Sequence, residues 1–134
     1  MSTLSNIPSQ AVVPLQAYDR DALRRAAERA DQLLLKADCR QAKDSQSVLA
    51  RIAQSFALPD RGHDLDALYD SVTELKPRHD AENPGFVVFL ENLPDTAEFG
   101  HEERNRLLDV FRDAADYFFD RQTAFRVFYS IDRG

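Results

Sequence analysis

Acidic side chains are concentrated in residues 63–75, read HDLDALYDSVTEL, where four carboxylates occur without a lysine or arginine. At about 100° per residue, Asp66, Asp70 and Glu74 fall on one side of a helix, at i, i+4 and i+8. The other side carries the apolar stripe that a helix usually buries, made of Leu65, Leu68, Val72 and Leu75. Like charges at this spacing repel by about 0.2–0.5 kcal/mol per pair, and the helix dipole favours acids only near the N-terminus. The carboxylates therefore form either a functional surface or simply the solvated face of an acidic protein.

Paired carboxylates can act as general acid and base, and Asp66 and Asp70 have the spacing of such a pair. For one of them to act as the acid, burial would have to raise its pKa. Nothing in the sequence indicates that either is buried. The four glycines are scattered rather than gathered in a phosphate-binding loop, and no GxSxG turn occurs. His63, His79 and His101 have no partner at metal-ligand spacing. We expect neither enzymatic activity nor a metal or cofactor.

The composition is that of a single globular domain of 134 residues with a net charge of -6. This charge argues against binding nucleic acid through its phosphates and favours a positively charged partner. One cysteine, no secretory signal in residues 1–10 and no apolar run of about 18 residues predict a cytoplasmic protein without a membrane segment. We expect it to be a monomer when free.

The elements that position the acidic helix follow from hydrophobic periodicity. Residues 1–18 lack periodicity and predict an irregular arm, docked through Val12, Val13 and Leu15. A thin apolar stripe predicts a helix from Asp19 or Asp21 to about Ala30, packed on as an extension. We therefore divide the chain into an N-terminal arm and helix, residues 1–31, and a main domain, residues 32–134.

The main domain alternates between helices and strands. Period-2 patterns predict strands over residues 32–40 and 125–131, the second an outer strand, and an all-apolar run predicts a central strand over residues 86–90. Period-3.6 patterns predict helices over residues 44–56 and 102–122 beside the acidic one. The alternation places Cys39 in the core rather than at a nucleophilic site. The expected fold is α/β, with a three-stranded parallel sheet and helices on one or both faces.

Residues 57–70, read ALPDRGHDLDALYD, resemble the signature of the barstar family of intracellular ribonuclease inhibitors. The resemblance extends over about residues 32–132 and implies that the protein plugs the active site of a small secreted ribonuclease. It implies that Asp66 and Asp70 are the two acidic positions of the inhibitory helix and that Tyr69 is the aromatic position between them. Asp113 matches an acidic contact on the following helix. Carboxylates on a rigid helix can imitate phosphate and accept bidentate hydrogen bonds from a cationic pocket.

Further partner-binding candidates are Gly62, Asp64, Glu74 and Arg61, which lie in or beside the same signature. The sequence differs from the family in its loop, where Asp60 and Arg61 stand in place of a longer segment that usually contains an aromatic residue. Asp64 also replaces a residue that is commonly asparagine. The partner is thus a basic protein, either a ribonuclease or, alternatively, a non-nuclease target of a barstar-like interaction or regulatory module.

Overall fold

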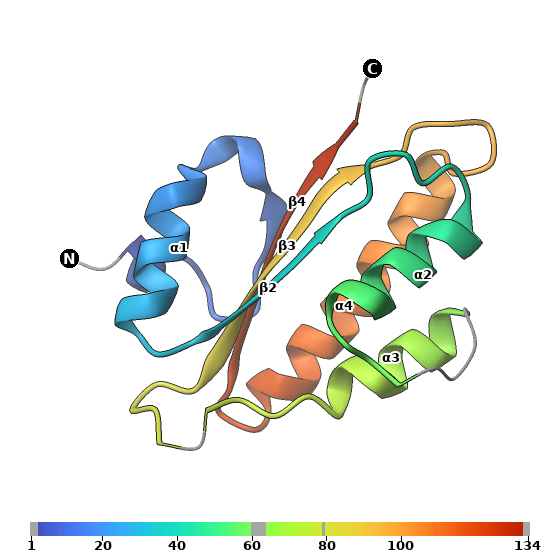
Figure 1. Ribbon diagram of the computed structural model, residues 1–134. Helices are drawn as coiled ribbons and strands as arrows, with labels where there is room; N and C mark the ends of the chain where they lie inside the picture. The colour runs from blue at the N-terminus through green and yellow to red at the C-terminus, as the bar shows by residue number, and fades with distance from the viewer. Residues whose placement is uncertain (1–2, 60–63, 79, 133–134) are drawn as a thin grey trace.

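The chain folds around a parallel β-sheet in the computed structural model, which describes residues 3–59, 64–78 and 80–132. Within these ranges the sheet has four strands in the order β1-β4-β3-β2, all paired in parallel. The strands are β1 (Val12–Pro14), β2 (Leu33–Asp38), β3 (Gly85–Leu93) and β4 (Ala124–Ile131). Figure 1 shows helix α1 (Arg20–Arg29) on one face of the sheet, and α2 (Ser45–Ser55), α3 (Leu65–Thr73) and α4 (His101–Phe119) on the other. None of the described helices is long and apolar enough to cross a membrane.

The predicted parallel α/β architecture is confirmed, but the prediction of three strands is wrong. The additional strand, β1, comes from the segment that the sequence predicts to be an irregular arm. Val12 pairs with Val127 and Val13 with Phe128, so β4 lies inside the sheet and is not an outer strand. A three-residue strand that ends in proline is too short to show a period of two, and its pairing depends on residues far along the chain.

Helix α1 covers a substantial part of the sheet and is more than a surface extension. Leu23, Ala26 and Ala27 are buried against Val87 and Phe128 of the central strands. Alanines allow the helix to approach the sheet closely, so a thin apolar stripe is enough to seal this face. The other face carries the larger core, formed by α2, α3 and α4 against the sheet.

Side-chain caps begin the helices where the sequence predicts them. The Asp19 carboxylate accepts hydrogen bonds from the backbone N–H groups of Asp21 and Ala22, at 3.0 and 3.2 Å. The Asp44 carboxylate accepts one from Ser47 N, at 2.9 Å, in a capping box. These bonds satisfy backbone donors that have no partner within a helix. Together the caps stabilise the first turns of α1 and α2.

A glycine-to-alanine substitution tests how closely β3 and β4 pack. A Cβ at Gly85 would lie 2.8 Å from both Ala124 Cβ and the Ala124 carbonyl oxygen. We expect Gly85→Ala to lower the free energy of unfolding by about 1–3 kcal/mol, because backbone must move to relieve this overpacking. Urea denaturation measures the change. The control is Gly100→Ala, where the nearest atoms lie 3.5 Å away and the expected loss is below about 1 kcal/mol. Equal losses in the two variants would contradict the packing argument.

Candidate functional site: an acidic groove between two helices

Helix α3 presents the carboxylates that the sequence singles out. Its N-cap is Asp64, whose carboxylate accepts a hydrogen bond from Ala67 N at 2.7 Å. Leu68 and Val72 are buried in the larger core, which fixes the rotation of the helix about its axis. Leu65 and Leu75, the other members of the predicted stripe, are half-buried and pack against that core. Because the apolar side is held down, Asp66 and Asp70 are exposed on the outer side, as predicted.

Asp66 and Asp70 line a groove of about 760 Å³ whose opposite wall is helix α4. Asp113 lies on this wall, so the structure brings together three of the predicted acidic positions. Asp116 and Asp120 line the same groove, one turn and two turns further along α4. Among the described residues, five carboxylates from two helices therefore border one open groove. Such a concentration of one sign of charge produces a strongly negative local field.

The floor of the groove is apolar and aromatic. Its lining includes Leu65 and Tyr69 from α3 and Val110 and Tyr117 from α4. All four pack against or belong to the larger core, which holds them in place. An aromatic floor below a ring of carboxylates suits a long cationic side chain, because it contacts the apolar stem while the carboxylates bind the charged end. The predicted aromatic position, Tyr69, thus lies in the groove beside Asp66 and Asp70.

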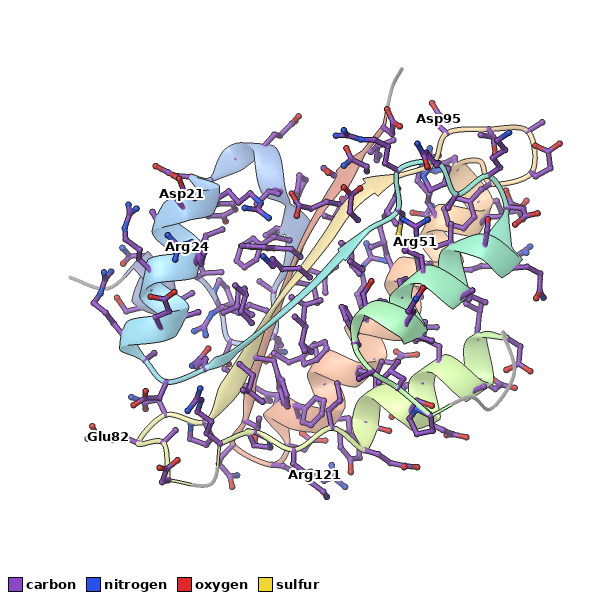
Figure 2. The ribbon with its side chains drawn as sticks, viewed as in Figure 1. Asp21, Arg24, Arg51, Glu82, Asp95 and Arg121 are labelled. Carbon is purple, nitrogen blue, oxygen red and sulfur yellow. The ribbon has the colours of Figure 1, made fainter. Side chains whose placement is uncertain are left out.

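Electrostatically, the groove is unneutralised except at one end. In the part of the chain that the structure describes, none of the five carboxylates forms an ion pair or accepts a side-chain hydrogen bond. Arg121 supplies a cation at the C-terminal end of α4 (Figure 2). Its guanidinium carbon lies 3.6 Å from the centre of the Tyr117 ring, and its Nη1 donates to the Tyr117 carbonyl oxygen at 2.9 Å. Arg121, which follows the C-cap of α4, is therefore held against the last turn of that helix.

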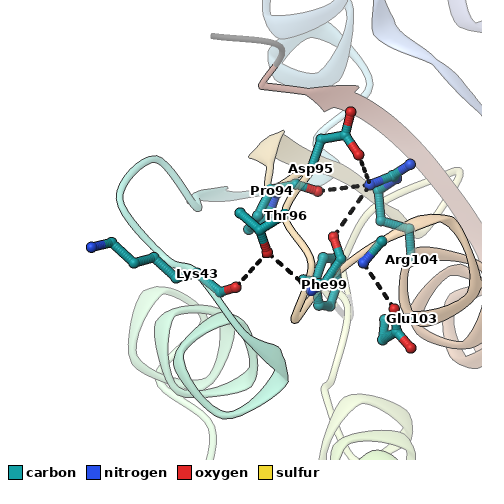
Figure 3. Close-up of polar contacts among 8 residues, drawn as sticks. Lys43, Pro94, Asp95, Thr96, Phe99, Glu103 and Arg104 are labelled. Carbon is teal, nitrogen blue, oxygen red and sulfur yellow. Dashed lines mark hydrogen bonds and ion pairs between the residues drawn. The ribbon is translucent and has the colours of Figure 1, made fainter.

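The N-terminal end of α4 is fastened to the start of α2 by a loop that Figure 3 shows in detail. Arg104 Nη1 donates to the carbonyl oxygen of Pro94 at 2.9 Å and to Asp95 Oδ1 at 3.1 Å. Thr96 Oγ1 donates to the carbonyl oxygen of Lys43, just before α2, at 2.7 Å. Arg104 is buried, so the bonds that it donates also offset the cost of removing its charge from water. They make α4 a rigid support for the aspartates further along it.

The remaining predicted residues lie elsewhere. Glu74 is the C-cap residue of α3 and does not line the groove. Asp64 caps the helix and lines a smaller cavity, of about 410 Å³, on the other side of Asp66. Arg61 and Gly62 lie outside the described residues, and so do His63 and His79. The predicted set is thus divided between the groove, the helix caps and a segment outside the described residues.

Neither Asp116 nor Asp120 is among the site residues predicted from the sequence. Asp113, Asp116 and Asp120 occur at i, i+3 and i+7, which places them on one helix face, as the spacing of Asp66 and Asp70 does on α3. The same like-charge pattern could have identified both faces. It could not have shown that the two faces border one groove.

Two further features restrict the chemistry. Among the described residues, no group of three or more His, Cys, Asp or Glu side chains is arranged to hold a metal ion. Cys39 is fully buried, as predicted, and burial raises the pKa of its thiol to about 12. A thiol held protonated in this way is a poor nucleophile. The arrangement of the groove therefore suits recognition of a cationic surface.

The fold and the groove define a small parallel α/β domain that presents an acidic surface. Residues 32–130 match the family model described as Barstar (barnase inhibitor), and the chain therefore belongs to the barstar family. This confirms the resemblance drawn from the sequence, and the family is one of inhibitors rather than enzymes. No curated protein and no solved structure matches the chain.

Proposed function

We propose that the protein inhibits a partner ribonuclease. It would act as an immunity protein that protects the cell from the ribonuclease that this cell makes. The groove would cover the cationic pocket in which the enzyme binds RNA phosphates. The main support is the placement of Asp66, Asp70 and Asp113 around one groove with an aromatic floor. Membership of the barstar family supports the same conclusion. Such an inhibitor would act in the cytoplasm, before the ribonuclease is secreted.

The physical mechanism is imitation of a phosphate backbone. Each carboxylate can accept two charge-assisted hydrogen bonds from an arginine of the partner, as a phosphate would. Because α3 and α4 are held rigidly, the negative groups need little reordering on binding, and this lowers the entropic cost of association. Tyr69 and Tyr117 would contact the apolar stems of the partner's cationic side chains.

The decisive experiment is a native pull-down from the source cells with the full chain as bait, followed by a ribonuclease assay. We expect a small basic protein whose ribonuclease activity is lost when an equimolar amount of the chain is added. The matched control is a bait with Asp66→Asn and Asp70→Asn, which has almost the same shape without the two charges and should recover much less of this protein. A ribonuclease recovered in full activity, uninhibited by the chain, would contradict the proposal.

A second candidate is an interaction or regulatory module with a basic partner that is not a nuclease. Arg121, held at one end of the groove, is the observation that favours it, because a cation there opposes a strongly cationic enzyme pocket. In the same pull-down, this candidate predicts a basic protein without ribonuclease activity, whose recovery still depends on Asp66 and Asp70.

A further inference from the structure

A buried arginine on β4 has a charge that the surrounding protein does not neutralise. Arg126 is only 8% exposed, and its Nε donates to the carbonyl oxygen of Ile7 at 3.1 Å. Neither of its Nη atoms has a hydrogen-bond or ion-pair partner among the described residues. Burial lowers the pKa of this guanidinium, and no carboxylate in the described part of the chain opposes the effect. The Nη atoms are not sealed from solvent, so this largely buried charge can pair with an anion that enters from outside.

Arg126 lines a cavity of about 1060 Å³ at the N-terminal ends of β2, β3 and β4. Two more arginines line it: Arg29 at the end of α1, and Arg121 at the boundary with the acidic groove. Glu82 is the carboxylate of this lining, and Figure 2 shows Glu82 and Arg121 at the same end of the molecule. The charged groups that the described residues supply to the lining thus comprise three cations and one anion, in a protein whose net charge is -6.

The remaining wall supplies both hydrogen bonds and an apolar contact. Ser9, Gln122 and Thr123 place polar groups around the cavity. Phe119, the large apolar side chain that stands out as 50% exposed among the described residues, lies on the same lining. An exposed aromatic ring on a lining that contains three arginines is suited to a ligand that combines an anionic group with a flat apolar body.

We propose that this cavity binds a small organic phosphate, with the phosphate at the two Nη atoms of Arg126 and the apolar body against Phe119. The free ends of the guanidinium form the planar fork that binds phosphate oxygens in a bidentate manner. Arg29 and Arg121 add positive charge that attracts the second negative charge of a phosphomonoester. A cavity of this volume is much larger than inorganic phosphate alone and can hold a mononucleotide. Apart from Arg121, which lines both, the residues of this site lie outside the acidic groove.

The test is a thermal-shift and calorimetric titration of the full chain with adenosine 5′-monophosphate, inorganic phosphate and adenosine. We expect saturable stabilisation by the nucleotide, weaker stabilisation by inorganic phosphate and none by adenosine. Anions that bind the folded state alone raise Tm in proportion to the logarithm of their concentration. The absence of saturable binding by both phosphate-containing probes would overturn the proposal, and so would equal binding of adenosine.

Substitutions locate the site. Arg126→Met leaves an unbranched side chain that is shorter and uncharged, so we expect an unchanged or higher Tm without ligand and loss of nucleotide binding. Arg29→Gln, on an exposed side chain, should weaken nucleotide binding several-fold without changing the fold. Arg25→Gln is the matched control, since Arg25 is exposed on the same helix and does not line the cavity. Wild-type affinity in both Arg126→Met and Arg29→Gln would place the nucleotide elsewhere and refute the assignment.

Discussion

Asp70→Ala is expected to weaken binding of the cognate partner by roughly 2–5 kcal/mol, which corresponds to a dissociation constant about 30-fold to several thousand-fold higher. This is the general range for charged hot spots at protein interfaces, of which the barstar–barnase complex is itself a standard example. Asp70 lies on the rigid helix, in the groove and above the aromatic floor, where a partner would exclude water from it. Removing the carboxylate would leave the partner's cation buried without its counter-charge, which is the costly part. Titration calorimetry with the partner recovered by pull-down measures the effect.

Folding should survive this substitution. The Asp70 side chain is exposed and forms no hydrogen bond with other described residues, so alanine leaves no buried donor without a partner. The matched control is Asp21→Ala, which removes the same charge from α1, on the other face of the sheet (Figure 2). We expect a small change in affinity for this variant. A dissociation constant unaffected by Asp70→Ala would remove α3 from the interface.

The orientation of α3 could be predicted from the sequence because it depends on local periodicity alone. Leu68 and Val72 must face the core, and a period of 3.6 residues then leaves Asp66 and Asp70 on the other side. The Asp64 cap follows from equally local chemistry, since a carboxylate before a helix accepts a hydrogen bond from the first turn.

Features that depend on distant parts of the chain could not be predicted in this way. The groove exists because α3 and α4 pack side by side, although β3 lies between them in the sequence. Periodicity carries no information about which helices pack together. Asp116 and Asp120 therefore acquire their place in the groove only in the fold. The same holds for β1, whose Val12 and Val13 become a strand by pairing with Val127 and Phe128.

The N-terminal segment shows a related limit. Its alanines give a weak apolar signal, yet Ala26 and Ala27 are among the most completely buried side chains of α1. Burial here results from close helix-to-sheet contact rather than from large apolar residues, so counting hydrophobicity underestimates it. The buried Arg126 could not be predicted either. Its position within an apolar strand gives no information about the cavity that it lines.

The second large effect is expected in the rate of association. Raising the ionic strength from about 0.01 M to 1 M shortens the Debye length from roughly 30 Å to 3 Å. Five carboxylates around one groove should attract a basic partner over the longer distance, so the association rate constant should fall by roughly 10- to 1,000-fold over this range. Stopped-flow measurements with the recovered partner determine this rate.

The contribution of α4 can be separated from that of α3 in the same experiment. A variant with Asp113→Asn, Asp116→Asn and Asp120→Asn keeps α3 intact but removes three charges from one wall of the groove. We expect a visibly flatter dependence of the association rate on salt, with a smaller change in the dissociation rate, because steering acts before contact whereas short-range hydrogen bonds act after it. An association rate that is independent of salt in the unmodified protein would show that the acidic groove does not guide the encounter. If instead only the dissociation rate of the variant changed, the α4 aspartates would be contact residues without a role in attraction.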